Sequence, residues 1–531
     1  MLRATPHAKS HTMSHATLNL RILRAASAAL ALALTASRAF AGDTVHVTYS
    51  VVGDWGSGYQ GALTITNNAS WTIPAWKLQF GATWAITDLW GAAVDQHAGT
   101  TYVLKHAASE SADLAPGQSV IMGWIGAPGN AAPPALPTLN GSPIVLNGDS
   151  PAPPPPQPVP APAWPSRFFS PFIDTTLWPL FDLNAYASAQ HVPFLTLGFI
   201  VAQDGNQCQG AWGGFAAYSV ASGFRLTEIN QLRAAGGDVR VSFGGAAGHE
   251  LALVCTSVES LRAAYQAAID AYGLRRIDFD IEGEAVEDLP SIHRRSQAIK
   301  LLQDQAQSAG GPLYVSLTLP VLPTGLVASG LQVVDSALTY GVRLDGVNIM
   351  AMDYGAAAPD PGGHMGEYAI QAATALHAQL KQRFAAHGMS KTDAEVWAII
   401  GVTPMLGYND IPGEIFDLVD AQQVLAFADQ HAIGSLSFWD ANRDHPCATP
   451  VPQPDNFCSG LPQAEYAFTG IFRAYAPPNA LADINSDGRV DGTDLGLMLG
   501  SWGTSSAAAD IDRSGTVDGT DLGLLLGAWT S

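Results

Sequence analysis

The segment Arg276-Ile277-Asp278-Phe279-Asp280-Ile281-Glu282-Gly283 alternates apolar and acidic residues from its second position onward. Side chains on a β-strand point to opposite faces in turn, so the three acids share one face and the three apolar residues share the other. When parallel strands close into a barrel, the apolar outer face packs against helices, which leaves the acids directed inward. The segment therefore predicts a barrel strand that carries a row of carboxylates.

Strand-like runs recur on both sides of this segment, and the stretches between them are helix-like. The runs begin 26 to 52 residues apart, which is enough for one helix and its loops each time. Eight strand-then-helix units predict a (β/α)8 TIM barrel with its active site at the carboxyl ends of the strands. A doubly wound open sheet is the alternative, but no G-x-G-x-x-G motif follows the first strand. The runs are 168–174, 194–202, 238–245, 276–283, 313–320, 346–354, 398–406 and 434–440.

The three acids also predict the chemistry of the site. Like charges along one narrow interior face cannot all ionise at low cost, so the group is expected to share protons and at least one pKa is expected to rise. A proton held near neutral pH makes one carboxyl a general acid, while an ionised neighbour stabilises positive charge. The alternatives are a metal site and a solvated edge strand. No histidine accompanies the acids, and a solvated edge would not carry Ile277, Phe279 and Ile281 on its other face.

Four motifs, on the expected third, fourth, sixth and eighth strands, resemble the family 18 glycoside hydrolases, the chitinases and related endo-N-acetylglucosaminidases. The fourth-strand signature of that family is D-x-x-D-x-D-x-E, and the chain matches its last three acids but has Arg275 at the first position. This departure removes no catalytic carboxylate. The family's S-x-G-G, M-x-Y and eighth-strand tryptophan are matched by Ser242-Phe243-Gly244-Gly245, Met352-Asp353-Tyr354 and Trp439.

The resemblance implies a role for each of these residues. Glu282 would protonate the glycosidic oxygen and later activate water, while the substrate's own 2-acetamido oxygen attacks C1 with net retention. Asp280 would hold the acetamido N–H, and Asp278 would share a proton with it. Tyr354 would hydrogen-bond the acetamido carbonyl, and Trp439 would form the floor of the sugar subsite. The other signature residues expected to line the substrate site are Met352, Ser242, Gly244 and Gly245.

A second frame exists for the sixth-strand signature. Met350-Ala351-Met352-Asp353 can also be aligned with M-x-Y-D, with methionine in place of tyrosine. We prefer Tyr354, because strand alternation would put Met350, Met352 and Tyr354 on one face. Asp353 would then be an outward or loop residue.

An N-terminal block, residues 43–147, contains short alternating runs separated by turn residues, which is typical of an all-β sandwich. Its runs 55–61, 75–80 and 114–117 resemble family 2 carbohydrate-binding modules, which bind crystalline cellulose or chitin through a flat row of exposed aromatic rings. Trp55 and Trp90 fall at two of the three family positions, and the third is Glu110. Trp76 is expected in the core. The resemblance implies chitin or a related insoluble polysaccharide as a partner, and a purely structural sandwich is the alternative.

Two segments are expected to lie outside the folded domains. Residues 1–41 have the features of a secretory signal peptide, because Arg21 and Arg24 precede a short apolar run and Ala39-Phe40-Ala41 supplies an A-x-A cleavage pattern. The mature protein is therefore expected to be extracellular. Residues 148–165 are expected to form an extended linker, since nine of the fifteen residues 151–165 are proline. The barrel, residues 166–475, follows this linker.

The segment 480–531 contains a 12-residue pattern twice, 27 residues apart. Oxygen-bearing side chains occupy positions 1, 3, 5, 9 and 12, glycine occupies position 6, and position 7 offers its carbonyl, as in calcium loops. A helix is expected after each loop. The pair resembles a dockerin, a small α-helical module that docks onto a cohesin of a scaffold or cell-surface protein; a calcium-stabilised stalk is the alternative. The expected ligands are Asp483, Asn485, Asp487, Arg489, Asp491, Asp494, Asp510, Asp512, Ser514, Thr516, Asp518 and Asp521.

Four cysteines suit an oxidising compartment, and they allow three pairings. Cys447–Cys458 would close a short loop, which leaves Cys208–Cys255 as the second disulfide. Metal ligation is the rival interpretation, but the chain has no C-x-x-C spacing.

Charge and composition narrow the function further. Lysine and arginine number 25 against 46 acids, a net charge of −21, and 47% of residues are hydrophobic. Such a chain has ample material for a core, and it repels nucleic acids and anionic membranes, which are therefore not expected partners. The whole sequence predicts a secreted, modular chitinase that needs no cofactor for catalysis. The rival functions are an endo-β-N-acetylglucosaminidase acting on N-glycans and a non-hydrolytic chitin-binding lectin.

Overall fold

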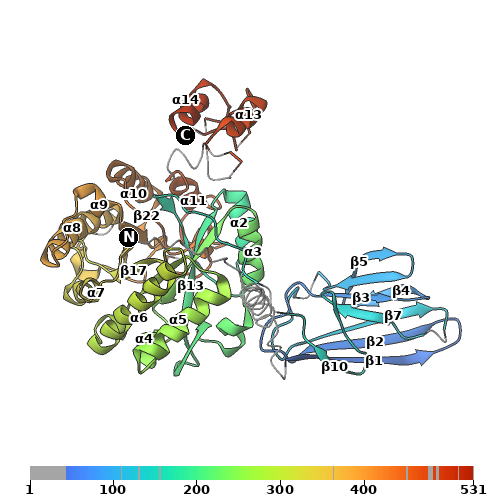
Figure 1. The fold of residues 1–531 in the computed structure, drawn as a ribbon. Coiled ribbons are helices and arrows are strands. Elements are labelled where there is room, and N and C mark those ends of the chain that lie inside the picture. The colour runs from blue at the N-terminus through green and yellow to red at the C-terminus, as the bar shows by residue number, and fades with distance from the viewer. Residues whose placement is uncertain are drawn as a thin grey trace, which may run out of the picture. The chain divides into compact units, whose positions relative to one another are not determined.

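The computed structural model describes residues 43–529 except 109–110, 130–131, 155–156, 361, 363, 450–451, 476–481, 483, 486–489, 507 and 512–513. The expected signal peptide, residues 1–41, and Glu110 lie outside the described residues. Contacts divide the chain into two compact units, Met1–Pro154 and Pro155–Ser531. The first unit consists of strands, whereas the second contains the helices and a parallel sheet (Figure 1).

The first unit is a sandwich of two five-stranded antiparallel sheets, as the alternating runs predict. One sheet has the order β10-β1-β2-β7-β4 and the other β5-β6-β3-β8-β9. The strands are β1 Thr44–Asp54, β2 Tyr59–Asn67, β3 Lys77–Gly81, β4 Ala85–Trp90, β5 Ala93–Ala98, β6 Thr101–Lys105, β7 Ser119–Ala127, β8 Ala135–Leu139, β9 Ser142–Pro143 and β10 Gly148–Pro151.

Aromatic rings fill the space between the two sheets. Trp124 of β7 is fully buried and stacks on Trp84 with ring centroids 5.6 Å apart. Trp76 is also buried, as expected for a core residue. The sandwich extends past the expected boundary at residue 147, because β10 pairs with Thr44–Val47 of β1 through Gly148–Pro151. The sequence missed this last strand because it lies at the start of the proline-rich stretch.

The second unit is built on a (β/α)8-like barrel of parallel strands. In strand order β11-β22-β19-β18-β17-β16-β15-β13-β12, the two ends are pieces of one segment: β11 pairs with β22, and β12 pairs with β13. The sheet therefore closes on itself, which confirms the barrel and excludes the open-sheet alternative. The strands are β11 Phe168–Phe169, β12 Phe172–Asp174, β13 Phe194–Gln203, β15 Asp238–Gly244, β16 Arg276–Asp280, β17 Tyr314–Pro320, β18 Gly346–Ala351, β19 Ile400–Pro404 and β22 Ser435–Leu436.

Helices surround this barrel and cover the apolar outer side of its strands (Figure 1). Phe279 of β16 stacks on Phe243 of β15, and both rings pack edge-on against Tyr265 of α5. This is the outward apolar face predicted for the acidic strand. The helices are α2 Leu183–Gln190, α3 Leu226–Ala234, α4 Leu251–Val254, α5 Val258–Tyr272, α6 Leu289–Ser308, α7 Ala328–Thr339, α8 Met365–Ala386, α9 Asp393–Trp397, α10 Leu418–His431 and α11 Ala467–Phe472. No helix among the described residues is long and apolar enough to cross a membrane.

All eight predicted strands are present, but several end earlier than the apolar runs suggest. β18 ends at Ala351 and β22 at Leu436, because the chain turns into the loops of the site there. Two additions were not predicted. β14 Gln207–Trp212 folds back antiparallel onto β13, and β20 Gly407–Tyr408 pairs with β21 Ile415–Phe416 in a short hairpin.

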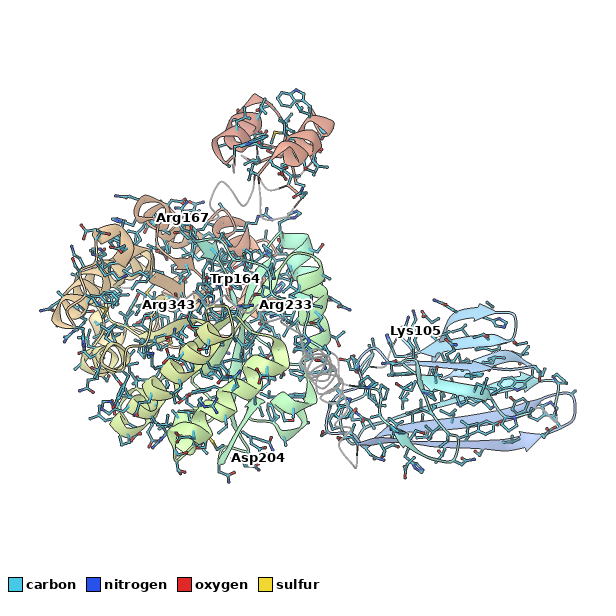
Figure 2. The ribbon with its side chains drawn as sticks, viewed as in Figure 1. Lys105, Trp164, Arg167, Asp204, Arg233 and Arg343 are labelled. Atoms are coloured by element: carbon cyan, nitrogen blue, oxygen red, sulfur yellow. A yellow bond between two sulfur atoms is a disulfide. The ribbon has the colours of Figure 1, made fainter. Side chains whose placement is uncertain are left out.

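The later half of the expected linker is attached to the barrel rather than free. Trp164 donates its indole N–H to Asp238 Oδ2 at 2.7 Å, and Arg233 pairs with the other oxygen of Asp238 at 2.7 Å. Figure 2 labels Trp164 and Arg233 in the barrel unit. Val159 N donates to Asn230 Oδ1 at 2.7 Å. The polyproline stretch therefore ends as a strap along α3 and the entry to β15.

Both expected disulfides form, Cys208–Cys255 and Cys447–Cys458. Near the C-terminus, α13 Gly492–Gly500 and α14 Gly519–Gly527 follow the two acidic loops, as the repeat predicts. Their core is itself repeated, with Val490 and Met498 from one half and Val517 and Leu525 from the other.

Candidate active site

The three acids of the β16 segment lie at successive depths in the barrel. Asp278 is fully buried, Asp280 is 5% exposed, and Glu282 is partly exposed. β16 ends at Asp280, but Glu282 keeps an extended backbone (φ −129°, ψ 171°) and Ile281 N still bonds to Thr318 O of β17 at 3.0 Å. The alternation predicted from the sequence therefore holds as far as Glu282 and puts all three carboxyls on the inner face.

Hydroxyl groups surround Asp278 at the bottom of this row. Ser242 Oγ donates to Asp278 Oδ2 at 2.8 Å, Thr318 Oγ1 lies 3.0 and 2.9 Å from the two carboxylate oxygens, and Ser316 Oγ donates to Oδ1. Neighbouring strands β15 and β17 supply these donors. Thr318 in turn accepts from Asn348 Nδ2 of β18 at 3.1 Å. Asp278 is thus fixed by its partners and lies too deep to reach a substrate.

A buried arginine lies beneath this cluster. Arg240 of β15 is 3% exposed and contacts hydroxyl groups: Thr196 Oγ1 at 3.0 Å and Ser316 Oγ at 3.4 Å. Burial lowers the pKa of Arg240, and the charge of Asp278 opposes this shift. The barrel core therefore places a positive charge below the acidic row, a feature that sequence analysis missed because Arg240 precedes the S-x-G-G motif by two positions.

Asp280 and Glu282 form a proton-sharing pair above Asp278. Burial raises the pKa of Asp280 well above its usual value, and the charges of Glu282 and Asp278 raise it further. Burial also raises the pKa of Glu282, although its side-chain hydrogen bond with Asp280 opposes this. Two carboxyls this close cannot both ionise cheaply, so the pair retains a proton to higher pH than an isolated carboxyl would. Asp280 Oδ1 is buried and has no hydrogen-bond partner within the described residues.

The turn after β18 brings a further acid to this pair. The chain leaves the strand at Ala351, and Asp353 has a left-handed backbone with φ +54°. Alternation therefore does not extend to Tyr354, and the argument that preferred Tyr354 on that basis is wrong. Asp353 does lie in a loop, but it is not directed away from the site, because its charge contributes to the raised pKa of Glu282. Burial raises the pKa of Asp353 itself to about 6.

Tyr354 nevertheless belongs to the same turn. Its side chain is 3% exposed, and its hydroxyl has no hydrogen-bond partner within the described part of the chain. Burial raises the pKa of this hydroxyl, so it remains a proton donor. Met352, the first residue of the turn, is partly exposed beside them.

A buried glutamate that sequence analysis missed holds this turn in place. Glu414, 1% exposed, accepts from Tyr354 N at 3.0 Å and from Gly355 N at 2.6 Å. Ile411 N, from the same connection between β20 and β21, donates to Asp353 Oδ1 at 3.1 Å. The hairpin therefore clamps the turn by three hydrogen bonds. No local signal in the sequence links residues 411–414 to residues 353–355, since the contact spans about 60 positions.

The two glycines of S-x-G-G are needed for close approach. Gly244 and Gly245 have φ of +106° and +87°. A Cβ on Gly244 would lie 2.0 Å from the carbonyl oxygen of Asp280, and one on Gly245 would lie 2.6 Å from the ring of Phe199. Their role is therefore to let β15 turn sharply against β16 and leave the space above Asp280 open.

Trp439 follows the end of β22 and forms one wall of the site. Its ring is partly exposed and stacks on Phe199 with centroids 5.4 Å apart, and Phe172 of β12 lies 6.1 Å away. Both partners come from the first two barrel strands, so the ring spans the junction where the barrel closes. A partly exposed indole supported on its other side is suited to stacking on a sugar face.

In the sandwich, the two expected aromatic residues are exposed. Trp55 is 54% and Trp90 is 42% exposed. A Cβ on Gly123 would lie 2.5 Å from the Trp90 ring, so this indole lies flat across β7 on the outer face of its sheet. Trp55 follows directly after β1, in the turn closed by the bond from its N–H to Gly58 O.

The C-terminal loops are only partly described: of the expected ligands, Asp483, Asp487, Arg489 and Asp512 lie outside the described residues. Within the described residues, no group of three or more His, Cys, Asp or Glu side chains could hold a metal ion. The acids at positions 9 and 12 form helix capping boxes, Asp491 with Asp494 and Asp518 with Asp521. Asp510, at position 1 of the second loop, accepts from Ser514 N and Gly515 N at 3.0 and 2.8 Å.

A closed parallel barrel whose inner face ends in carboxyls with raised pKa values, beside a partly exposed indole, suits a glycoside hydrolase. Two curated proteins resemble this part of the chain. A probable bifunctional chitinase/lysozyme of Escherichia coli is 40% identical over 318 residues, which cover 59% of this chain and 35% of that protein. Endochitinase 11 of Metarhizium anisopliae is 40% identical over 291 residues, which cover 54% of each protein.

A solved structure resembles the barrel unit, and a family model matches the sandwich. The catalytic domain of a hyperthermophilic chitinase from Pyrococcus furiosus superposes with a TM-score of 0.53 at 34% identity, over 59% of this chain and 96% of that domain. Residues 45–144 match the family described as cellulose binding domain. The chain spans about a third and about half of the two curated relatives. It belongs to the glycoside hydrolase family 18 chitinases and has an N-terminal module of the cellulose binding domain family.

Proposed function

We propose that the protein is a secreted chitinase that hydrolyses β-1,4-linked N-acetylglucosamine polymers with retention of configuration. The observation that carries the proposal is the row of Asp278, Asp280 and Glu282, in which Glu282 alone is partly exposed and burial raises the pKa of both Asp280 and Glu282. A partly exposed carboxyl with a raised pKa is suited to protonate a glycosidic oxygen at near-neutral pH.

In this proposal the substrate supplies the nucleophile. Asp280 Oδ1 and the Tyr354 hydroxyl are buried and unpartnered among the described residues, so both are free to bind an acetamido group. Asp280 would accept the acetamido N–H, and Tyr354 would donate to the acetamido carbonyl, which together orient its oxygen toward C1. Glu282 protonates the leaving oxygen as the C1–O bond breaks, and it then takes a proton from the water that opens the oxazolinium ring.

The sandwich is proposed to hold the enzyme on insoluble chitin or cellulose through Trp55 and Trp90. The match of this module to cellulose binding domains supports a polysaccharide surface, which favours a chitinase over an endo-β-N-acetylglucosaminidase that acts on glycoproteins. The lectin alternative is disfavoured because Glu282 is present and buried carboxyls accompany it.

For the C-terminal segment we propose calcium binding and, through it, docking onto a cohesin-like partner. The donors are carboxylate, amide, hydroxyl and carbonyl oxygens, which are the ligands that calcium prefers. The backbone N–H groups directed onto Asp510 and Asp494 support loops that wrap around a central point. Calcium would supply structural stability and no step of catalysis.

The test is reducing-end release from colloidal chitin by the wild type and by Glu282→Gln, with carboxymethyl cellulose as the control substrate. We expect the wild type to cleave chitin and the variant to lose at least 100-fold in rate, a typical loss for a general acid. If the wild type binds chitin and releases no reducing ends, the lectin alternative is correct. Release from an N-glycosylated protein but not from chitin would instead support the endo-β-N-acetylglucosaminidase.

A further inference from the structure

A cavity of about 340 Å³ lies in the barrel unit, and none of the three carboxylates of the β16 segment lines it. Its walls come from the segment after β12, from α2, and from the residues that follow β22. We infer that this rim cavity binds one uncharged pyranose, an N-acetylglucosamine unit of the polysaccharide. The choice of sugar rests on the proposed function, whereas the existence and chemistry of the cavity do not.

The rim cavity lies at the carboxyl ends of barrel strands. Asn442 lines it and joins two strand ends, because it accepts from Asp174 N at 3.1 Å and donates to Asp174 O at 3.2 Å. Asp174 is the last residue of β12, and Trp439 lies three positions before Asn442. A sugar in the rim cavity would therefore be on the same face of the barrel as a sugar stacked on Trp439.

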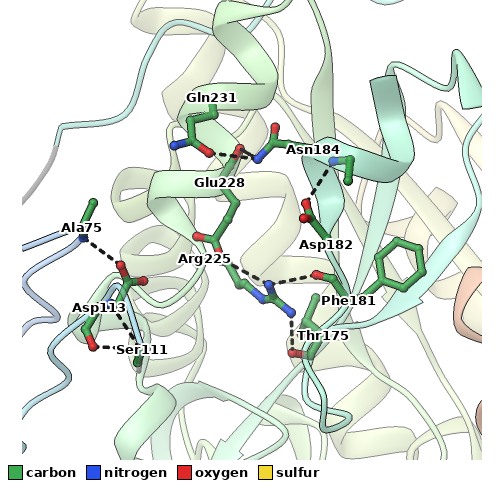
Figure 3. Close-up of polar contacts among 11 residues, drawn as sticks. Ala75, Ser111, Asp113, Thr175, Phe181, Asp182, Asn184, Arg225, Glu228 and Gln231 are labelled. Carbon is green, nitrogen blue, oxygen red and sulfur yellow. Dashed lines mark hydrogen bonds and ion pairs between the residues drawn. The ribbon is translucent and has the colours of Figure 1, made fainter. Parts of the chain in front are cut away.

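One wall of the rim cavity is held by a buried arginine. Arg225, 4% exposed, donates to Phe181 O at 3.1 Å and to Thr175 O at 3.2 Å, and pairs with Glu228 at 3.1 Å (Figure 3). Asp182 caps α2 by accepting from Ala185 N at 2.9 Å. These bonds fix the backbone at Phe181 and at the start of α2, so the Phe181 ring is a preorganised part of the wall.

The opposite wall is held by a buried aspartate. Asp444 accepts from Phe468 N at 3.1 Å and from both the N–H and the hydroxyl of Thr469 at 2.7 Å, and its carbonyl accepts from Tyr466 N. Tyr466 has a left-handed backbone, with φ +56°. A non-glycine residue in this region costs about 1–2 kcal/mol, and such strain is concentrated at functional sites.

Aromatic side chains line the rim cavity between these walls. The ring of Tyr186 lies 5.2 Å from Phe181 and 5.3 Å from Tyr466, and His445 lies 4.6 Å from Tyr466. Phe457, 45% exposed, completes the lining from the loop that Cys447–Cys458 closes. Aromatic faces of this kind complement the C–H faces of a pyranose and the methyl of an acetamido group.

The charges around the rim cavity select against anions. Burial raises the pKa of Tyr466, and the negative charges of Glu465, Asp444 and Asp182 raise it further. Neither lysine nor arginine is among the described lining residues, and His445 pairs with Glu465. An aromatic cavity with carboxylate and amide oxygens at its edge suits a neutral ligand rich in hydroxyl donors, which is the chemistry of a sugar.

The test is photo-crosslinking of the full-length Glu282→Gln protein with a chitotriose that carries a diazirine, followed by mapping of the labelled peptides. We expect label on peptides covering 179–189 or 442–466, in addition to label in the site of Glu282. The double variant Phe181→Ala/Phe457→Ala should reduce the rim label at least fivefold and leave the label beside Glu282 unchanged, which also shows that the barrel is folded. Tyr340→Ala, at the far end of α7, is the matched aromatic control.

Label confined to the Glu282 site and the sandwich, or rim label that the double variant does not change, would overturn the inference. A glucosamine trimer with the same diazirine carries positive charges. If it labels the rim cavity more strongly than chitotriose does, the inference that the cavity binds an uncharged sugar is wrong. The labelling experiment needs no turnover, so it separates the two proposals. Rim label on the variant, together with a wild type that releases no reducing ends from chitin, would refute the proposed function alone.

Discussion

Asp278, Asp280 and Glu282 follow one another at intervals of two residues, yet each has a different environment. Hydroxyl donors from neighbouring strands surround Asp278, whereas Asp280 has an unpartnered oxygen and Glu282 reaches the surface. At the scale of single residues, the chemistry therefore depends on depth in the barrel. The same residue types at the same spacing on a solvated strand would be three ordinary carboxylates.

The charge of Asp353 should affect the pH at which activity is lost on the alkaline side. A raised pKa keeps Glu282 protonated below that pKa, and activity is lost as pH rises through it and the acid form disappears. Since the charge of Asp353 helps to raise this pKa, Asp353→Asn should move the alkaline limb of kcat/KM to lower pH, by roughly 0.5 to 1 unit for one nearby charge.

The measurement is a pH–rate profile on a soluble chito-oligosaccharide. Asp360→Asn is the control, because Asp360 is an exposed acid a few residues along the same connection. An alkaline limb that stays in place, or moves to higher pH, would show that Asp353 does not act on the general acid.

At the scale of elements, the hairpin of β20 and β21 decides where the turn after β18 lies. Its Glu414 accepts two backbone N–H groups of that turn, and Arg443 supports its base by donating to Leu406 O at 2.9 Å and to Tyr408 O at 2.6 Å. A turn of this kind would otherwise be free to move, since Asp353 occupies a strained left-handed conformation. The hairpin is therefore part of the site although it carries none of the signature residues.

Glu414→Gln should disturb the turn without creating a cavity. An amide of the same shape offers one acceptor instead of two, so a buried N–H of Tyr354 or Gly355 loses its partner at a cost of about 1–3 kcal/mol. We expect kcat to fall about tenfold or more and the melting temperature to fall by a few degrees. Steady-state kinetics and thermal unfolding measure both.

Glu367→Gln, an exposed position on α8, is the matched control. A lower melting temperature with unchanged kcat would mean that Glu414 stabilises the hairpin alone and does not position the catalytic turn.

At the scale of the whole molecule, the chain joins parts that are stabilised in different ways. The barrel closes through its own first strand and contains both disulfides, whereas the C-terminal pair of helices has a small core of its own. A core of this size gives little stability, and the acids around it repel one another unless cations bind.

Calcium should therefore protect the C-terminal segment of the intact chain. At a concentration 100 times Kd, binding to the folded state alone adds about 2.7 kcal/mol to its stability. We expect limited proteolysis to remove residues 480–531 in EGTA and to spare them in calcium, as followed by intact mass. Asp510→Asn should abolish the protection, whereas Asp304→Asn on α6 should not. Equal resistance in EGTA would contradict calcium binding.

The sequence alone determined the elements whose signal is local. Apolar runs separated by helix-like stretches located the eight barrel strands, and period-two alternation located the sandwich strands and the acidic row. Both patterns are local, because they record which faces of a strand are buried. The family signatures also placed Ser242 and Gly244 at the end of the third strand. Gly245 and Trp439 lie just beyond the ends of β15 and β22.

Only the tertiary structure decided what joins distant segments. Four features depend on contacts between residues far apart in the chain. They are the clamp of Glu414 on Tyr354, the position of Arg240 beneath Asp278, the attachment of Trp164 to Asp238 and the aromatic wall of the rim cavity. No local period records such contacts, because they arise when the barrel closes and brings loop ends together. Strand ends were misjudged for the same reason, since an apolar run continues into a loop whenever that loop is itself buried.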